Sequence, residues 1–358
     1  MTDEVLIREE GVAGILSLNR PRAIHALTLP MVRAMAQALM GWRKEAPVKE
    51  SGVKVVLIDH AEGRGFCAGG DINLLRQSAL EDGGVAGRKF FFDEYRLNHL
   101  LFTYGAPVVG FMDGITMGGG VGISQPARFR VATENTRFAM PETGIGLFPD
   151  VGGGWYLSRL AGRLGQYLAL TGARLDGAEC LWAGLATHYL PAASLPQAKA
   201  RLIAGEAPQA VLDALAVTPP EPKIAAHAEA IARLFASDTY EDVLAALVAE
   251  NGEWESATLA TLRTKSPQAC KVALRQLATS LAFSGPDAGP NFAANMAMEY
   301  RIGSRVLMLP DFAEGVRAII VDKDNAPVWS PATPEGVTQD MLDAIFAPLS
   351  PLEEWKPL

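Results

Sequence analysis

Three segments of the chain combine glycines with acidic residues and could carry chemistry. They are GFCAGGDI at Gly65–Ile72, MDGITMGGGVG at Met112–Gly122 and MPETGIGLFPDVGGG at Met140–Gly154. The first two offer backbone N–H groups, because a residue without a Cβ lets the backbone approach a ligand closely. The third offers the carboxyl groups of Glu142 and Asp150.

The two glycine segments together could bind one oxygen atom. If a backbone N–H from each segment pointed to the same place, the pair would form an oxyanion hole that stabilises negative charge on a carbonyl oxygen. Taken singly, such segments also serve as tight turns or allow close packing of a helix on a sheet, and that alternative stays open. Neither segment fits the G-x-G-x-x-G or Walker A nucleotide motifs.

Glu142 and Asp150 lie among apolar residues, which predicts that they are shielded from water. Desolvation raises the pKa of a carboxyl group and suits it to acid–base work. Two structural alternatives stay open: Glu142 could cap a surface turn, and Asp150 could cap a helix that begins near Gly154.

Glu94, in FFDEYRLN, is a third candidate carboxylate. Its spacing alone favours a solvated helix position paired with Arg88 or Arg96. The five histidines are scattered and show no metal-ligand spacing, and no G-x-S-x-G serine nucleophile motif is present. The residues therefore predict neither a metal site nor a serine hydrolase.

Apolar periodicity predicts an α/β body over residues 1–195, which carries all three segments, followed by a mostly helical region over residues 196–358. Buried strands lead into the first two segments, and a hairpin opens the chain. The predicted strands are Val5–Arg8, Gly14–Leu18, Val53–Ile58, Pro107–Met112, Arg128–Ala132 and Arg137–Met140, and the predicted helices are Leu29–Arg43, one from Ile72, and Arg88–Leu101.

Composition narrows the class of protein. The chain has 358 residues, 49% of them hydrophobic, and its net charge of −8 argues against a broad surface for nucleic acid or an anionic membrane. Three scattered cysteines predict a reducing compartment. With no signal-peptide pattern and no run of about 18 apolar residues, we expect a cytoplasmic protein without a membrane span.

Taken together and in order, the motifs FCAGGDI, DGITMGGGVG and FAMPETGIGLFPDVGGGWYLSRL resemble the crotonase (enoyl-CoA hydratase/isomerase) superfamily. Within it, EYRLN at Glu94–Asn98 and EGVRAIIVDKDNAPVW at Glu314–Trp329 are most similar to the branch of 3-hydroxyisobutyryl-CoA hydrolases. The resemblance implies a spiral of ββα units with a helical C-terminal region. It also implies an acyl-CoA substrate, no further cofactor, and in many members a homo-oligomer.

The resemblance also implies roles for individual residues. The oxyanion hole falls on Gly70 and Gly119, and Glu142 matches a retained catalytic glutamate. Hydratases carry a second catalytic glutamate where this chain has Gly122. They have glycine where this chain, like the hydrolase branch, has Asp150. Glu94 matches a substrate-site glutamate of that branch.

Contacts to the CoA part of the substrate are implied at Arg22, Ala23, Ala68 and Gly70, since family members hold CoA largely through backbone groups near these positions. Basic side chains bind its phosphates in the family. Arg22 and Arg64 are the candidates for that task here.

The expected activity is hydrolysis of 3-hydroxyisobutyryl-CoA, or a close 3-hydroxyacyl-CoA, to the free acid and CoA, a step of valine breakdown in the family. Glu142 would act as the nucleophile or as the general base. The alternatives are an enoyl-CoA isomerase or hydratase of the same superfamily and a non-catalytic CoA-binding protein. The preferred acyl chain and the oligomeric state stay open.

Overall fold

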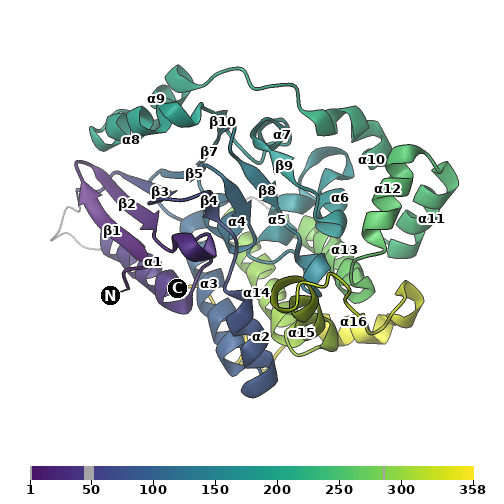
Figure 1. Ribbon diagram of the computed structural model, residues 1–358. Helices are drawn as coiled ribbons and strands as arrows, with labels where there is room; N and C mark the ends of the chain where they lie inside the picture. The colour runs from purple at the N-terminus through teal and green to yellow at the C-terminus, as the bar shows by residue number, and fades with distance from the viewer. Residues whose placement is uncertain (1, 44–51, 285–286) are drawn as a thin grey trace.

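The described residues of the computed structural model, 2–43, 52–284 and 287–358, form two β-sheets surrounded by helices (Figure 1). The larger sheet has the strand order β1-β2-β3-β5-β7-β10, and the smaller one has the order β4-β6-β8-β9. The strands are β1 (Val5–Glu10), β2 (Ala13–Leu18), β3 (Val55–His60), β4 (Gly65–Cys67), β5 (Val108–Met112), β6 (Ile115–Met117), β7 (Phe129–Ala132), β8 (Arg137–Ala139), β9 (Leu175–Asp176) and β10 (His188–Tyr189).

The chain winds between the sheets in a repeated ββα pattern. In each turn one strand joins the larger sheet, the next joins the smaller sheet, and helical segments follow. Successive turns pair in parallel, β3 with β5 with β7 and β4 with β6 with β8. This arrangement confirms the spiral predicted from the motifs. The helical segments are α2 (Ile72–Glu81) and α3 (Val85–Phe102) after β4, α4 (Gly119–Ser124) after β6, and η2 (Glu142–Ile145) and α5 (Gly153–Ser158) after β8.

The spiral brings the three candidate segments together. Parallel strands end at the same edge of a sheet, and each segment contains or follows the carboxyl end of β4, β6 or β8. Residues that are far apart in the sequence therefore lie side by side at this edge.

Most predicted elements are confirmed, with four differences. The opening hairpin pairs Val5 with Leu18, and Thr28 caps the helix after it by accepting a hydrogen bond from the Met31 N–H. However, β4 and β6 lie inside segments predicted as loops, and β9 and β10 were not predicted. Strands of two or three residues are too short to show an alternation of polar and apolar positions, so periodicity cannot reveal them.

The remaining helical segments complete the chain. They are η1 (Pro21–Ala23), α1 (Leu29–Trp42), η3 (Ala161–Arg163), α6 (Leu164–Thr171), α7 (Gly177–Trp182), η4 (Ala192–Ser194), α8 (Leu195–Ile203), α9 (Pro208–Leu215), η5 (Lys223–His227), α10 (Ala228–Leu234), α11 (Tyr240–Glu250), α12 (Glu253–Leu262), α13 (Pro267–Ala282), α14 (Ala288–Val306), α15 (Pro310–Val316), the π-helix η6 (Arg317–Val321), η7 (Pro334–Gly336) and α16 (Gln339–Phe346).

C-terminal helices pack directly on the elements that carry the candidate residues. Helix α14 contacts α3, α13 contacts α5, and α15 contacts both α2 and η2. Buried side chains from both halves of the chain, such as Leu101 and Phe292, belong to one hydrophobic core. The predicted division of the chain into two parts near residue 195 stays a prediction. No helix in the described ranges is long and apolar enough to cross a membrane.

Phe292 joins the two halves and provides a test of this shared core. Its buried ring stacks on Phe102 with centroids 4.0 Å apart and meets Trp155 edge-on. We expect Phe292→Ala to lower the free energy of unfolding by about 3–5 kcal/mol, because it leaves a cavity. Denaturant unfolding followed by fluorescence measures this change.

The matched control is Leu281→Ala on α13, whose side chain is 51% exposed. It should change the free energy of unfolding by less than about 0.5 kcal/mol. Equal effects of the two substitutions would contradict a core that runs through both halves.

Candidate active site

A cavity of about 340 Å³ lies where the three segments meet. Loops after β4, β6 and β8 form one side of it, and C-terminal residues form another. Its lining consists of Ala68, Gly69, Gly70, Ile72, Leu75, Phe90, Phe91, Glu94, Met117, Gly118, Gly119, Pro141, Glu142, Gly144, Ile145, Leu147, Asp150, Val151, Arg174, Lys265, Ile319 and Ile320. Gly70, Gly119, Glu94, Glu142 and Asp150, all predicted site residues, are thus brought together.

The two predicted N–H donors border the same part of this cavity. Leu27 donates to the Gly69 carbonyl at 2.7 Å and accepts from the Asp71 N–H at 2.9 Å, so the bridge leaves the Gly70 N–H on its other side. Gly119 is the first residue of α4, and the N–H groups of the first turn of a helix have no partner within the helix. Within the described ranges neither N–H donates a hydrogen bond.

The two glycine segments also touch each other. A Cβ at Gly119 would lie 3.2 Å from the carbonyl carbon of Gly69, to which the Gly70 nitrogen is bonded. A Cβ at Gly118, where φ is +46°, would lie 3.2 Å from Glu142 Oε1. A side chain at either glycine would therefore fill the space between the N–H groups and the carboxylate. That they form an oxyanion hole stays a prediction.

Glu142 is buried beside these glycines, with 5% of its surface exposed. Its Oε2 atom has no hydrogen-bond partner among the described residues. Burial raises the pKa of the Glu142 carboxyl well above its usual value, and the nearby Asp150 adds to the rise. The alternative of a surface turn cap is therefore wrong, because apolar residues and α15 cover the turn.

The Asp150 carboxyl group accepts a hydrogen bond from a neighbouring side chain. It is 5% exposed, and its Oδ2 accepts a hydrogen bond of 2.9 Å from the Tyr95 hydroxyl. Burial raises the pKa of Asp150 to about 7, while the Tyr95 hydroxyl opposes the rise. Asp150 does not cap α5, since Gly152 occupies the N-cap position.

Glu94 faces the same cavity from α3. It is 2% exposed, and its Oε1 has no partner in the described part of the chain. Burial raises the pKa of Glu94 well above its usual value, and Asp150 raises it further. The expected solvated position paired with Arg88 or Arg96 is wrong, because the helix turns this face toward the core.

Three carboxyl groups thus share a space that is poorly solvated. Charged groups of like sign that lie close together in a low dielectric cannot all ionise near neutral pH. The set of Glu94, Glu142 and Asp150 must therefore hold at least one proton, and its apparent pKa values belong to the set as a whole.

Gly122 decides what this set can do. A Cβ there would lie 2.6 Å from the Cβ of Val151 and 2.8 Å from the Asn98 amide nitrogen, so the site has no room for a side chain. The Asn98 amide donates to the Gly122 carbonyl at 2.9 Å and holds this contact. A second carboxylate cannot project from this position to orient a water molecule together with Glu142.

Several residues at the cavity were missed from the sequence. Tyr95 follows Glu94 directly and donates to Asp150, and Arg174 and Lys265, which line the cavity, come from segments far along the chain. Burial lowers the pKa of the Lys265 ammonium. Local sequence carries no signal for Arg174 or Lys265, because only the tertiary fold brings them to the cavity.

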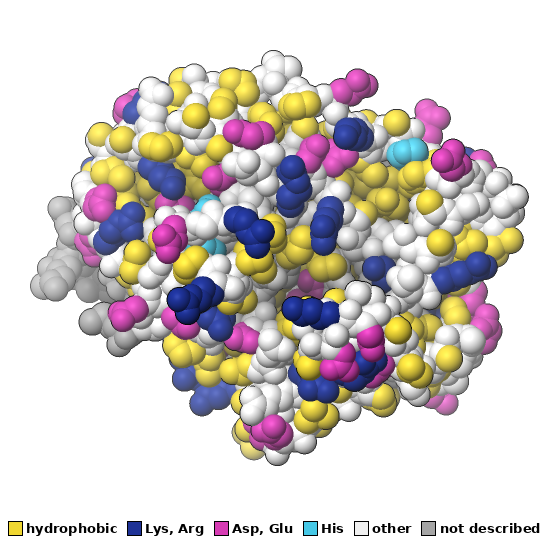
Figure 2. All heavy atoms as spheres, viewed as in Figure 1, with side chains coloured by type: hydrophobic (Ala, Val, Ile, Leu, Met, Phe, Trp, Pro, Cys, Tyr) yellow, Lys and Arg dark blue, Asp and Glu magenta, His cyan; other side chains and the backbone are white. Residues whose placement is uncertain are grey.

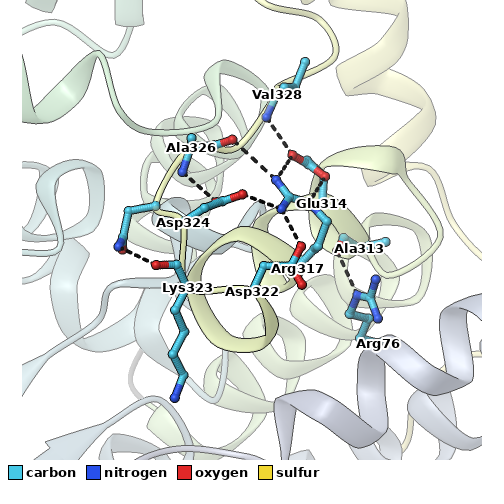
Figure 3. Close-up of polar contacts among 10 residues, drawn as sticks. Arg76, Ala313, Glu314, Arg317, Asp322, Lys323, Asp324, Ala326 and Val328 are labelled. Atoms are coloured by element: carbon cyan, nitrogen blue, oxygen red, sulfur yellow. Dashed lines mark hydrogen bonds and ion pairs between the residues drawn. The ribbon is translucent and has the colours of Figure 1, made fainter.

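One arginine, Arg317, lies at the centre of a group of polar contacts in the C-terminal region (Figure 3). Arg317 opens the π-helix whose Ile319 and Ile320 line the cavity. It donates hydrogen bonds of 2.6–2.8 Å to three carboxylates, those of Glu314, Asp322 and Asp324. The bonds tie the loop after the π-helix back onto α15. Such π-helical turns occur frequently at functional sites.

The sequence of the chain matches the family model described as enoyl-CoA hydratase/isomerase over residues 13–346. The chain belongs to the enoyl-CoA hydratase/isomerase family. The resemblance inferred from the motifs is thereby confirmed.

Members of the family with different names resemble this chain over nearly its whole length. A mitochondrial 3-hydroxyisobutyryl-CoA hydrolase from Xenopus tropicalis is 40% identical over 360 residues, which cover 97% of this chain and 89% of that protein. The crystal structure of a carnitinyl-CoA dehydratase from Mycobacterium thermoresistibile is 39% identical, with a TM-score of 0.91 and 99% of each chain covered. The crystal structure of an enoyl-CoA hydratase from Rhodobacter sphaeroides 2.4.1 is 36% identical in sequence, with a TM-score of 0.88. The match covers 99% of this chain and 100% of that chain.

The residues expected to contact CoA are divided by the structure. Ala68 and Gly70 line the cavity, and the Ala68 N–H donates to the Ile24 carbonyl at 2.9 Å. Arg22 and Ala23 lie in η1, outside the cavity lining, and both Arg22 and Arg64 are exposed. Figure 2 shows Lys and Arg side chains around the middle of this face of the molecule. The CoA contacts of all five residues stay predictions.

No cluster of three or more His, Cys, Asp or Glu side chains with the geometry of a metal site occurs in the described part of the chain. The expectation that the reaction needs no cofactor stays a prediction.

Burial of Glu142 has a consequence for stability. Because its folded-state pKa is raised, the folded protein keeps the proton that the unfolded chain loses, and stability falls as pH rises from the unfolded pKa to the folded one. Glu142→Gln has no such loss. The melting temperature of Glu142→Gln, minus that of the unsubstituted protein, should therefore increase as the pH is raised from about 5 to about 8.

Thermal unfolding at both pH values tests this. Glu253→Gln, at an exposed position of α12, serves as the control and should keep a constant difference from the unsubstituted protein. A melting temperature of Glu142→Gln that falls in parallel with the unsubstituted protein would show that Glu142 is ionised in the folded state.

Proposed function

We propose that this protein hydrolyses 3-hydroxyisobutyryl-CoA, or a closely related 3-hydroxyacyl-CoA thioester, to the free acid and CoA. The similarity to a relative named as a hydrolase of that thioester, which extends over nearly the whole chain, supports the proposal. The observation that carries it is the site itself. Two N–H groups without a hydrogen-bond acceptor among the described residues and a set of buried carboxyls border one cavity, and Gly122 excludes the second carboxylate of a hydratase.

The thioester carbonyl oxygen would lie between the N–H groups of Gly70 and Gly119. Negative charge develops on that oxygen when the carbonyl carbon is attacked, and two fixed donors stabilise it; losing one such donor typically costs about 3–4 kcal/mol of barrier. The donors need no rearrangement during the reaction, because the Leu27 bridge and the start of α4 already fix them.

Glu142 would cleave the thioester by one of two routes. As a nucleophile, a carboxylate oxygen bonds to the carbonyl carbon, the C–S bond breaks, and CoA leaves as a thiolate that takes up a proton. Water then hydrolyses the mixed anhydride. As a general base, Glu142 takes a proton from the water that attacks the same carbon, and the tetrahedral intermediate then breaks its C–S bond to release the acid and the CoA thiolate, which takes up a proton. Its position beside Gly118 suits both routes.

Asp150 and Glu94 would recognise the 3-hydroxyl group of the acyl chain. Both are buried and line the cavity, and a carboxyl group can accept from or donate to a hydroxyl according to its protonation. With a pKa of about 7, Asp150 can also carry a proton to the departing thiolate.

Isomerisation of an enoyl-CoA is the second candidate function. The two similar crystal structures are of proteins named as a dehydratase and a hydratase, and Glu142 or Asp150 could shuttle a proton between carbons. Release of a free thiol from 3-hydroxyisobutyryl-CoA distinguishes hydrolysis from this alternative, because isomerisation leaves the thioester intact.

Basic side chains on the surface would bind the CoA phosphates, with the exposed Arg22 and Arg64 as candidates. The cytoplasmic location and a homo-oligomeric state stay predictions, and the name of the Xenopus relative places that protein in mitochondria.

Glu142→Gln should still bind acyl-CoA but hydrolyse it about 10²–10⁴-fold more slowly. The glycine N–H groups still hold the carbonyl, whereas the amide is neither a nucleophile nor a base. Thiol-release kinetics give the rate and calorimetric titration with 3-hydroxyisobutyryl-CoA gives the affinity. Glu253→Gln is the control, and an unchanged rate in Glu142→Gln would refute the role of Glu142.

The value of kcat/KM should rise as pH increases from about 6 to about 9, because the acting carboxylate must be ionised and burial raises its pKa. Tyr95→Phe removes the hydroxyl that stabilises ionised Asp150 and so raises the pKa of Asp150 above about 7. Asp150 then stays protonated to higher pH and its charge no longer raises the pKa of Glu142, so the rising limb should move to lower pH.

Tyr156→Phe is the matched control, since the buried Tyr156 hydroxyl has no hydrogen-bond partner among the described residues. Its profile should match that of the unsubstituted protein. A limb that stays in place or moves to higher pH in Tyr95→Phe would contradict the coupling between Tyr95, Asp150 and Glu142.

A further inference from the structure

A fourth buried carboxylate, Glu299 on α14, lies outside the cavity lining and has no part in the proposed chemistry. It is fully buried on the apolar face of its helix, in line with Phe292 and Met296. A charged residue is rarely fully buried without partners. Its partners therefore indicate what it is for.

The partners of Glu299 lie in the turn that carries Asp150. Its Oε2 accepts from the Gly152 N–H at 2.7 Å, and its Oε1 accepts from the Gly154 N–H at 3.0 Å. The Oε1 also accepts from the side-chain amides of Gln276, at 2.9 Å, and Asn295, at 2.8 Å. All four donors require an acceptor oxygen at these places.

Gln276 extends the network to the other side of Asp150. Its amide donates to the Pro149 carbonyl at 2.7 Å as well as to Glu299. The residue before Asp150 and two of the residues that follow it are thus bonded to α13 and α14. Asp150 itself receives no bond from these helices.

The turn needs such restraint. Val151 has φ of +54°, a left-handed conformation that is a genuine outlier for a β-branched residue, and Gly152 has φ of +89°. Strained backbone of this kind persists only where the surroundings fix it, and it clusters at functional sites. The N–H bonds to Glu299 supply that fixation directly after Val151.

We propose that Glu299, with Gln276, is a positioning residue that fixes the turn Pro149–Gly154 so that the Asp150 carboxyl faces the Tyr95 hydroxyl and the 3-hydroxyl of the substrate. This inference rests on the proposed function. Helices from the C-terminal region thereby determine whether a 3-hydroxyacyl-CoA is preferred over the same acyl-CoA without the hydroxyl.

Glu299→Gln tests the proposal with almost no change in volume. The amide nitrogen of the new glutamine is a donor and takes the place of one carboxylate oxygen. It then faces N–H donors, so at least one N–H of the turn loses its acceptor. We expect kcat for 3-hydroxyisobutyryl-CoA to fall by up to about 10²-fold through misplacement of Asp150. The ratio of activity on 3-hydroxyisobutyryl-CoA to activity on isobutyryl-CoA should fall with it, whereas a merely structural residue would lower both activities alike.

A double-mutant cycle with Asp150→Asn makes the test specific. If Glu299 acts through Asp150, Glu299→Gln should cost less than about 3-fold in kcat once Asp150→Asn is present, because contacting residues are not additive. The same loss in both backgrounds would overturn the positioning role. A protein that releases no thiol from any acyl-CoA before substitution would overturn the proposed function and this inference with it.

Two further variants guard against loss of folding. Gln276→Leu removes the bond to Pro149 and one bond to Glu299, and it should reproduce the fall in the hydroxyl preference. Gln268→Leu is its matched control on α13, since Gln268 is also buried but its amide nitrogen has no partner within the described ranges. It should leave the preference unchanged, and equal effects of the two substitutions would contradict the proposal.

Discussion

The structure depends on keeping several carboxyl groups together in a place that water hardly reaches. Glu94, Glu142 and Asp150 border one cavity with little exposed surface, and no basic side chain forms an ion pair with any of them in the described part of the chain. Such an arrangement costs stability, because each group that ionises loses its hydration and repels the others. The same cost makes the groups reactive, since a carboxyl with a raised pKa exchanges protons near neutral pH.

The spiral provides the cavity, and the C-terminal helices close and fix it. Parallel strands bring the Gly70 and Gly119 segments to one edge, and the missing Cβ atoms leave space for the reacting groups. The helices then act on the turns between strands and not on the strands themselves. Ser266 at the start of α13 donates its N–H to the Thr143 carbonyl, next to Glu142, and Glu299 holds the turn after Asp150.

Sequence patterns could predict the parts of the site that depend on local chemistry. Gly70, Gly119, Glu142 and Asp150 stand in distinctive motifs, and the structure places all of them at one cavity. Spacing alone wrongly predicted an exposed position for Glu94. Helix α3 is buried on several sides, so its periodicity does not show which face is exposed to solvent. Lys265 and Glu299 lie more than a hundred residues from the segments they meet, and only the fold relates them to the site.

The central claim is that the buried set holds a proton at neutral pH, part of it on Glu142. Infrared difference spectroscopy detects protonated carboxyl groups directly through their C=O stretching band, which shifts in heavy water. The account predicts that the band persists at about pH 7 and loses intensity in Glu142→Gln. If the spectrum at that pH shows no protonated carboxyl, or if Glu142→Gln leaves the band unchanged, the account of the site is wrong.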